Sequence, residues 1–342
     1  MSDTRGHDEI TRLRQLIMGF RVTQLIYVAA KLDLADHLAR GPLTAPELAS
    51  SLGVDAGALY RLLRALASLA VFVESSDGRF EMTPAAELLR RHAPGSLHST
   101  AMLYGDELLW RAYGRLSQAI ETGGSAFEHV YGQPFYDYLG EHPNSAALFH
   151  EAMTGFSELE AAAIMAAYDF STVGSVVDVG GGQGALAAAL LHTHPHLQAV
   201  IFDRTPATHD TQKFFALSGI AGRSKFIQGN FFIAVPGGGE LYLLKSILHN
   251  WHDSAAATIL GKCRDAMAMD ARLLVAERVI PSGNAPSEAK LFDINMLVTV
   301  AGRERTEAEY VTLFRSAGLE LRKVTPTRSH LSLIEAARLE RN

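Results

Sequence analysis

The sequence has little of what secreted, membrane-spanning or nucleic-acid-binding proteins need. Its 342 residues include one cysteine, Cys263, so an internal disulfide is excluded and a reducing compartment is favoured. No stretch approaches the ~18 uninterrupted apolar residues of a membrane span, and the N-terminal residues lack the basic-then-apolar layout of a signal peptide. No basic run is present, and the formal net charge of −6 disfavours nucleic acid as a partner. We therefore expect a cytoplasmic protein that binds neither membranes nor nucleic acid.

The N-terminal part of the sequence predicts a helical domain with a β-hairpin. Thr44 and Glu47 form a capping box, and Asp55 can cap the helix that follows. The alternating runs 71–74 and 79–82 flank an Asp-Gly turn, which is a strong hairpin signal. Helices followed by a hairpin form the layout of a winged helix, and we assign this domain to residues 1–96.

A winged helix raises the possibility of DNA binding, which would rest here on Arg61 and Arg64 of the second helix. Two arginines are what any solvated helix face shows, and the net acidity opposes a DNA site. A packing or dimerisation role is therefore favoured for this domain.

The rest of the chain divides into a helical region and an α/β domain. Residues 97–167 are mostly helical and rich in aromatic side chains, which suits a linker that also walls a substrate pocket. Residues 168–342 alternate strands and helices, which predicts a doubly wound, Rossmann-like and mostly parallel sheet with an appended strand pair. The strands are expected at residues 175–179, 199–203, 225–228, 240–245, 272–276, 320–324 and 329–335.

The most informative motif is Val177-Asp178-Val179-Gly180-Gly181-Gly182-Gln183-Gly184, a strand that runs into a glycine turn and then a helix. Such a turn lets the backbone approach a ligand and leaves N–H groups free at the helix start. Gly180, Gly182 and Ala185 also satisfy the looser dinucleotide fingerprint. Asp178 favours S-adenosylmethionine, because a cofactor with an ammonium group gains a partner there and a pyrophosphate gains little. Asp203, at the end of the next strand, lies where a ribose-binding carboxylate belongs in either class.

A second candidate site follows the expected strand 240–245, where a loop delivers His249. Loops beyond the carboxyl ends of parallel strands form the ligand crevice of such sheets. By contrast, His192, His194 and His196 straddle a proline at a helix end without an acidic cluster. A solvated helix terminus is favoured there over a metal site, and we expect no metal.

Together these stretches resemble a known enzyme family over nearly the whole chain. The sequences VVDVGGGQG, IFD, GNFF, LLKSILHNWHD, AERVIP and MLVTVAGRERTEAEY are similar to those of the metal-independent small-molecule O-methyltransferases. Plant caffeic acid and flavonoid enzymes typify this family, and its bacterial relatives methylate polyketides and other secondary metabolites. The resemblance implies S-adenosylmethionine as cofactor, an aromatic or polyketide-like substrate, and a homodimer formed through the N-terminal domain.

The resemblance also implies roles for individual residues. Cofactor contacts are implied for Asp178, Gly180, Gly182, Asp203, Asn230, Phe231, Lys245 and Ser157. Substrate contacts are implied for Phe149, Met153, Asn250, Trp251, Asn295 and Met296. His249 matches the general base, and Glu277 and Glu304 match the acids that flank it. The family usually has aspartate at Asn230 and Asn250, so we expect a weaker, uncharged contact to the adenine here.

The chemistry agrees with these roles. Deprotonating a phenol of pKa near 10 at pH 7 costs about 4 kcal/mol, and a histidine of pKa near 7 reduces that cost best. We expect Glu277 to hold the imidazole in one tautomer. Alternatively, Glu277 pairs with Arg278 or another arginine, and Glu304 forms a surface ion pair with Arg303 or Arg305.

Two further functions stay open on the sequence alone. One is an enzyme that keeps the cofactor fold but catalyses a hydroxylation or a pericyclic reaction. The other is a winged-helix regulator that senses a ligand. The identity of the substrate is not encoded in any motif.

Overall fold

The computed structural model describes residues 2–204 and 209–339 and divides into two compact units. The first unit holds the residues up to Arg111 together with His142–Gly155, and the second holds Ala112–Glu141 and the chain from Phe156 onward. Each unit is described by itself below.

The first unit is built from short helices and one small sheet. Its elements are α1 (Ser2–Ile17), α2 (Gly19–Lys31), α3 (Leu34–Leu38), β1 (Leu43–Thr44), α4 (Ala45–Leu52), α5 (Ala56–Ser68), β2 (Phe72–Glu74), β3 (Arg79–Met82), α6 (Pro84–Glu87), α7 (His98–Gly105) and most of α8 (Glu107–Tyr113). The sheet order is β1-β3-β2, with both pairs antiparallel. The hairpin and the expected caps are confirmed: Thr44 and Glu47 form a capping box, and Asp55 accepts from Ala58 N–H. The winged-helix interpretation itself stays a prediction.

Close packing of two helices stabilises this unit. Leu34, Leu48 and Leu63 are fully buried in its core. Helix α7 approaches α2 at Gly105, where an added Cβ would lie 2.2 Å from Cβ of Tyr27. A side chain at Gly105 would therefore require the two helices to separate.

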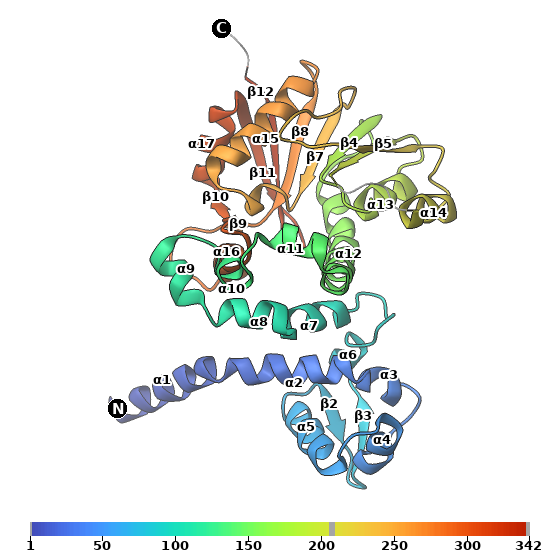
Figure 1. Cartoon of the computed structure of the whole chain (residues 1–342), viewed down its shortest axis with the longest axis vertical. Coiled ribbons are helices and arrows are strands. Elements are labelled where there is room, and N and C mark those ends of the chain that lie inside the picture. The colour runs from blue at the N-terminus through green and yellow to red at the C-terminus, as the bar shows by residue number, and fades with distance from the viewer. Residues whose placement is uncertain (1, 205–208, 340–342) are drawn as a thin grey trace. The chain divides into compact units, whose positions relative to one another are not determined.

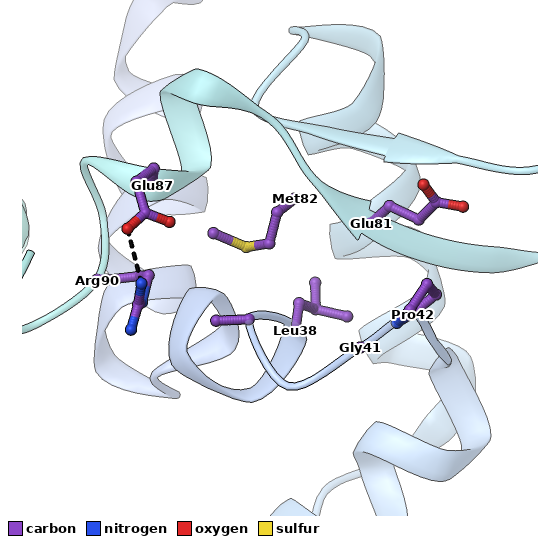
Figure 2. Close-up of a pocket in the computed structure, with 8 residues that line it drawn as sticks. Leu38, Gly41, Pro42, Glu81, Met82, Glu87 and Arg90 are labelled. Atoms are coloured by element: carbon purple, nitrogen blue, oxygen red, sulfur yellow. Dashed lines mark hydrogen bonds and ion pairs between the residues drawn. The ribbon is translucent and has the colours of Figure 1, made fainter.

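A shallow hollow lies beside the small sheet of the first unit (Figure 2). It is lined by Leu38, Ala39, Gly41, Pro42, Glu81, Met82, Glu87 and Arg90. Figure 2 shows the ion pair between Arg90 and Glu87, whose closest atoms are 2.7 Å apart. Because Glu81 and Glu87 are exposed and Arg90 is already paired, no unmatched buried charge marks this hollow as a catalytic site.

The second unit is an α/β domain with additional helices. The helical elements are α9 (Leu116–Thr122), α10 (Ala126–Tyr131), α11 (Phe135–Glu141), the later part of α12 (Pro143–Ala167), α13 (Ala185–Thr193), α14 (His209–Leu217), the 3-10 helix η1 (Leu248–Asn250), α15 (Asp253–Ala266), α16 (Glu288–Val300) and α17 (Glu307–Ser316). The strands are β4 (Ser175–Val179), β5 (Gln198–Asp203), β6 (Ser224–Gln228), β7 (Leu241–Lys245), β8 (Arg272–Glu277), β9 (Val279–Ile280), β10 (Arg305–Thr306), β11 (Leu319–Pro326) and β12 (Ser332–Arg338).

Seven of these strands form one sheet in the order β11-β12-β8-β7-β4-β5-β6. The pairs from β8 to β6 are parallel, whereas β12 and β11 are antiparallel to their neighbours. The predicted Rossmann-like sheet with an appended strand pair is thereby confirmed. The chain leaves β4 for β5 on one side and later returns to place β7 on the other, so the topological switch point lies between β4 and β7.

Helices cover both faces of this sheet (Figure 1). On one face, Ile259 of α15 and Phe314 of α17 pack with Val177 and Val275. On the other face, Ile164 of α12 and Leu190 of α13 belong to a second core. Two-sided burial explains why the parallel strands are almost wholly apolar. Within the described residues no helix is long and apolar enough to cross a membrane.

Replacing Gly105 with alanine is expected to destabilise the first unit by about 1–3 kcal/mol, because the new Cβ overlaps Tyr27. Thermal unfolding of Gly105→Ala measures the loss. Gly57→Ala is the matched control, since its Cβ meets only an ordinary contact in α5 and alanine favours helix. Equal melting temperatures for the two variants would contradict the close helix approach.

Candidate functional site

The predicted site residues of the second unit gather at the carboxyl edge of the parallel strands. Asp178 lies in β4, Asp203 ends β5, Lys245 ends β7 and Glu277 ends β8. Because parallel strands end at the same edge, four polar side chains from separate parts of the sequence meet beside the switch point between β4 and β7.

The glycine turn after β4 is closely packed from below. Gly180 has φ +76° and Gly184 has φ +80°, the left-handed region that glycine adopts without strain. A Cβ at Gly180 would lie 2.3 Å from Cδ1 of Ile247, and one at Gly181 would lie 2.6 Å from Oδ2 of Asp178. Gly182, in contrast, has no heavy atom within 4 Å of a built Cβ, so the turn is open on its outer side.

Asp178 is a buried carboxylate without a partner. Its side chain is 2% exposed, and its Oδ2 has no hydrogen-bond partner among the described residues. Burial raises the pKa of Asp178 to about 7; Lys245 lowers this pKa and Asp203 raises it further. An unpaired buried acid is costly unless a ligand supplies the missing cation.

The acids at this turn fit S-adenosylmethionine better than a dinucleotide. Asp203 Oδ2 accepts from the N–H of Gly182 at 2.9 Å, so an acid occupies a donor that a pyrophosphate would need. The carboxylate of Asp178 packs directly beneath the turn and would repel a second anion. An ammonium group would satisfy Asp178, and the ribose contact expected of Asp203 stays a prediction.

Aromatic side chains continue the site beyond β6. Phe231 lies 3.9 Å from a Cβ built on Gly180, which places its ring beside the glycine turn. Trp251 stands edge-on to Phe232, with ring centroids 4.8 Å apart, and to Phe231 at 6.2 Å. The ring of Trp251 thus packs with the expected adenine-binding residue, and its expected substrate contact stays a prediction. Asn230 Oδ1 accepts from the N–H of Phe232 at 2.9 Å, which fixes this short turn.

Lys245 forms a buried ion pair that the sequence did not predict. Its Nζ lies 2.9 Å from Oε2 of Glu160 in α12, and His330 Nε2 lies 2.6 Å from the other carboxylate oxygen. Burial raises the pKa of Glu160, but the hydrogen bond from His330 and the charge of Lys245 outweigh it and hold the pKa below its usual value. Because Glu160 neutralises Lys245, the carboxylate of Asp178 stays available for another cation.

His249 lies in η1 and is 6% exposed. Its Nδ1 lies 2.9 Å from Oε1 of Glu304, and Glu304 is 1% exposed. An Nδ1–H that donates to this carboxylate leaves Nε2 as the acceptor of the neutral imidazole. The alternative of a surface ion pair for Glu304 is therefore wrong. A buried carboxylate behind a histidine orients the ring and stabilises its protonated form.

Glu277 does not hold the imidazole, which corrects the expectation from the sequence. Its Oε1 accepts from the backbone N–H groups of Ile247, Leu248 and His249, and its Oε2 accepts from the hydroxyl of Tyr310 at 2.6 Å. Both oxygens are thereby used, and the alternative pair with Arg278 is absent within the described residues. Glu277 fixes the turn that carries His249, and Glu304 orients the ring.

Two further residues that sequence reasoning missed hold the same turn. Arg305 is fully buried and donates to Asp253 and to the carbonyl oxygens of Leu248 and Trp251. Gly302 lies against the turn, since a Cβ there would be 2.1 Å from the carbonyl oxygen of His249. The next residue, Arg303, donates its N–H to that oxygen at 2.8 Å. The family-like stretch that contains Glu304 was the available signal for these residues. The burial of its neighbours could not be predicted from the sequence.

The expected substrate residues are only partly brought together. Asn295 is buried in α16, where its Oδ1 accepts from the hydroxyl of Tyr113 at 3.0 Å, and burial raises the pKa of Tyr113 to about 12. Met296 is buried beside it. Asn250 donates from Nδ2 to the carbonyl oxygens of Ser246 and Ile247, so its amide closes the turn.

The remaining expected contacts lie along α12. Phe149 and Met153 belong to the first unit, and Ser157 belongs to the second. Their roles at the site stay predictions. Among the residues that the structure describes, no group of three or more His, Cys, Asp or Glu side chains is arranged to hold a metal ion.

Comparison with known proteins identifies matching families over both parts of the chain. The profile of the O-methyltransferase domain matches residues 113–320, and that of the O-methyltransferase dimerisation domain matches residues 14–92. The phenazine O-methyltransferase of Lysobacter antibioticus is 40% identical over 95% of this chain and 95% of its own. The 3-amino-4-hydroxybenzoate 4-O-methyltransferase of Streptomyces cremeus is 39% identical over 96% of this chain and 90% of its own.

A solved structure shows a ligand-bound relative. An O-methyltransferase from neocarzinostatin biosynthesis, in complex with S-adenosylmethionine and 2-hydroxy-5-methyl naphthoic acid, superposes with a TM-score of 0.79. It is 34% identical in sequence and covers 93% of this chain and 96% of its own.

Cofactor affinity is expected to increase as the pH rises from about 5.5 to 7. The binding form of Asp178 is the carboxylate, and because its pKa is raised to about 7, binding at lower pH must first remove a proton. Calorimetry with S-adenosylhomocysteine measures the dissociation constant across this range, below the usual pKa of the ligand's α-amino group. Asp178→Asn should bind more weakly and lose the pH dependence; an unchanged profile would refute the ammonium contact.

Gly302→Ala is expected to lower turnover by up to about a hundredfold, because the added Cβ displaces the turn that carries His249. Calorimetry with S-adenosylhomocysteine shows whether the variant still binds the cofactor product. Gly261→Ala in α15 is the matched control, with no heavy atom within 4 Å of its built Cβ. Full activity of the Gly302 variant would contradict the role assigned to this contact.

Proposed function

The chain belongs to the O-methyltransferase family, and we propose that it methylates a hydroxyl of an aromatic or polyketide-like secondary metabolite with His249 as general base. S-adenosylmethionine is its cofactor. The observation that carries the proposal is the buried pair of His249 and Glu304 at the sheet edge that also holds Asp178. The names of the relatives support the substrate class, since they act on a phenazine and on a hydroxybenzoate.

The cofactor supplies an electrophilic methyl group, and the protein supplies alignment. Methyl transfer from a sulfonium is an in-line displacement. Holding the two reactants in the required geometry makes a bimolecular reaction effectively unimolecular. Asp178 binds the ammonium end, Asp203 the ribose, and Asn230 and Phe231 the adenine. Trp251, whose ring packs on Phe231, stays assigned to the substrate. Lys245 acts on the cofactor side through its pair with Glu160.

His249 removes the proton of the attacking hydroxyl at Nε2. The carboxylate of Glu304 stabilises the imidazolium that results. Its other oxygen, Oε2, is buried and has no partner among the described residues, so no other donor competes for this carboxylate. Because a phenol titrates near 10, transfer of its proton to a histidine reduces the ~4 kcal/mol cost of forming phenolate at pH 7. The proton is released to solvent after methyl transfer.

Specificity is assigned to the helical walls. Substrate contacts are assigned to Asn295, Met296, Phe149, Met153 and Asn250, as the family resemblance implies, and a cofactor contact is assigned to Ser157. The match to the dimerisation domain supports the predicted homodimer. A cytoplasmic location is consistent with a free, buried Cys263.

His249→Ala is expected to lower turnover at least about tenfold without changing cofactor affinity, and Glu304→Gln should cause a smaller loss. Mass analysis with a labelled methyl donor and 3-amino-4-hydroxybenzoate measures the product, and calorimetry measures cofactor binding. His192→Ala, at an exposed helix end, is the control. A product without the added methyl would favour the non-methylating chemistry, and undiminished turnover in His249→Ala would remove this residue as base.

A further inference from the structure

We propose that Arg278 binds a carboxylate carried by the aromatic substrate, so that the preferred substrate is a hydroxyaryl carboxylic acid. This inference rests on the proposed function and adds the anionic group that the site selects. The residue follows directly after β8, between Glu277 and β9.

Arg278 is a buried cation whose donors are unsatisfied. The residue is 5% exposed, and its Nε is buried without a hydrogen-bond partner among the described residues. No hydrogen bond within the described part of the chain uses its guanidinium group. Its ion pair with Glu288 spans 3.6 Å and involves a carboxylate that is 64% exposed, a geometry that contributes little. A guanidinium left in this state lacks the anion that buried charges require.

Arg305 shows what a structural arginine looks like in the same region. It is also buried, yet its guanidinium donates to Asp253 and to backbone carbonyl oxygens. The chain thus satisfies one buried arginine with hydrogen bonds and leaves the other without any from the described residues. A purely structural role explains Arg305 but not Arg278.

Arg278 and the proposed base lie against the same aromatic ring. Its guanidinium carbon lies 3.6 Å from the ring centroid of Phe292 in α16. The same ring stacks on the imidazole of His249, with centroids 6.1 Å apart and an interplanar angle of 24°. Phe292 therefore links the cation to the base. An aromatic substrate whose hydroxyl reaches His249 can present a ring substituent to Arg278.

The chemistry of the guanidinium selects the substituent. Contact with the face of Phe292 leaves the N–H donors at the edge of the guanidinium plane, where they form a planar fork. A carboxylate accepts two parallel hydrogen bonds from such a fork, and charge-assisted bonds of this kind are about twice as strong as neutral ones. The cofactor also carries a carboxylate, but its amino-acid end is assigned to the turn after β4, on the other side of β7.

The test compares acids with their uncharged amides in the protein saturated with S-adenosylhomocysteine. The probes are 3-amino-4-hydroxybenzoate and 2-hydroxy-5-methyl naphthoic acid, each with its carboxamide, and calorimetry measures the dissociation constants. We expect at least one acid to bind the wild type about tenfold or more tightly than its amide. This ratio should fall to near one in Arg278→Gln and recover in part in Arg278→Lys, which keeps the charge but loses the fork. Glu288→Gln is the control and should keep the ratio.

Each outcome decides the matter. Equal binding of acids and amides by the wild type, failure of both acids to bind, or an unchanged ratio in Arg278→Gln overturns the proposal. A weaker affinity of Arg278→Gln for S-adenosylhomocysteine itself would assign the residue to the cofactor and overturn it too. Thermal unfolding shows whether the variants are folded, and if Arg278→Gln is not, the lysine variant decides by its smaller ratio.

The proposed function fails separately. If the acids bind with the expected dependence on Arg278 but no labelled methyl reaches either, the anion site stands and methyl transfer to these hydroxyls does not. If acid and amide are methylated and bound equally well, the opposite holds.

Discussion

The position of the proposed base, His249, depends on one carboxylate that does not contact its imidazole. Oε1 of Glu277 accepts hydrogen bonds from three consecutive backbone N–H groups of the turn after β7, and its Oε2 accepts one from the hydroxyl of Tyr310. Charge-assisted bonds of this kind contribute about 1.5–3 kcal/mol each, and removing the acceptor would leave several buried donors unsatisfied. Because β8 is paired on both sides, the turn is fixed to the interior of the sheet. Glu304 can orient the imidazole of His249 only because Glu277 fixes the backbone of the turn that carries it.

The sequence predicted the scaffold because local patterns and burial agree there. The strand at residues 175–179 and the cap at Asp55 follow from apolar runs and from side-chain chemistry within a few residues. It could not assign Glu277 and Glu304 correctly, because both are acids near the histidine and only loop geometry decides which one reaches the ring. Nor could it separate Arg278 from Arg305, since satisfaction of a buried charge depends on partners that are distant in sequence.

The buried charges of the second unit fall into two kinds. Glu160 and Arg305 are matched by partners within the described chain, and they hold α12 and the turn at η1 in place. Asp178 Oδ2 and Arg278 Nε have no hydrogen-bond partner among the described residues, and each lies at a position where a ligand is expected. A buried charge without a partner lowers the stability of the protein, and binding of the ligand restores that stability. Such charges therefore indicate a functional site more reliably than the residue type does.

The exposed apolar helix face of the first unit has a consequence for the stability of the protein in solution. Leu16, Ile17 and Phe20 are more than half exposed along α1 and α2, in the segment that matches a dimerisation domain. Apolar surface of this kind is removed from water only when a second chain covers it. The apparent melting temperature therefore depends on how concentrated the protein is, and dilution alone weakens the fold without any change in sequence or solvent.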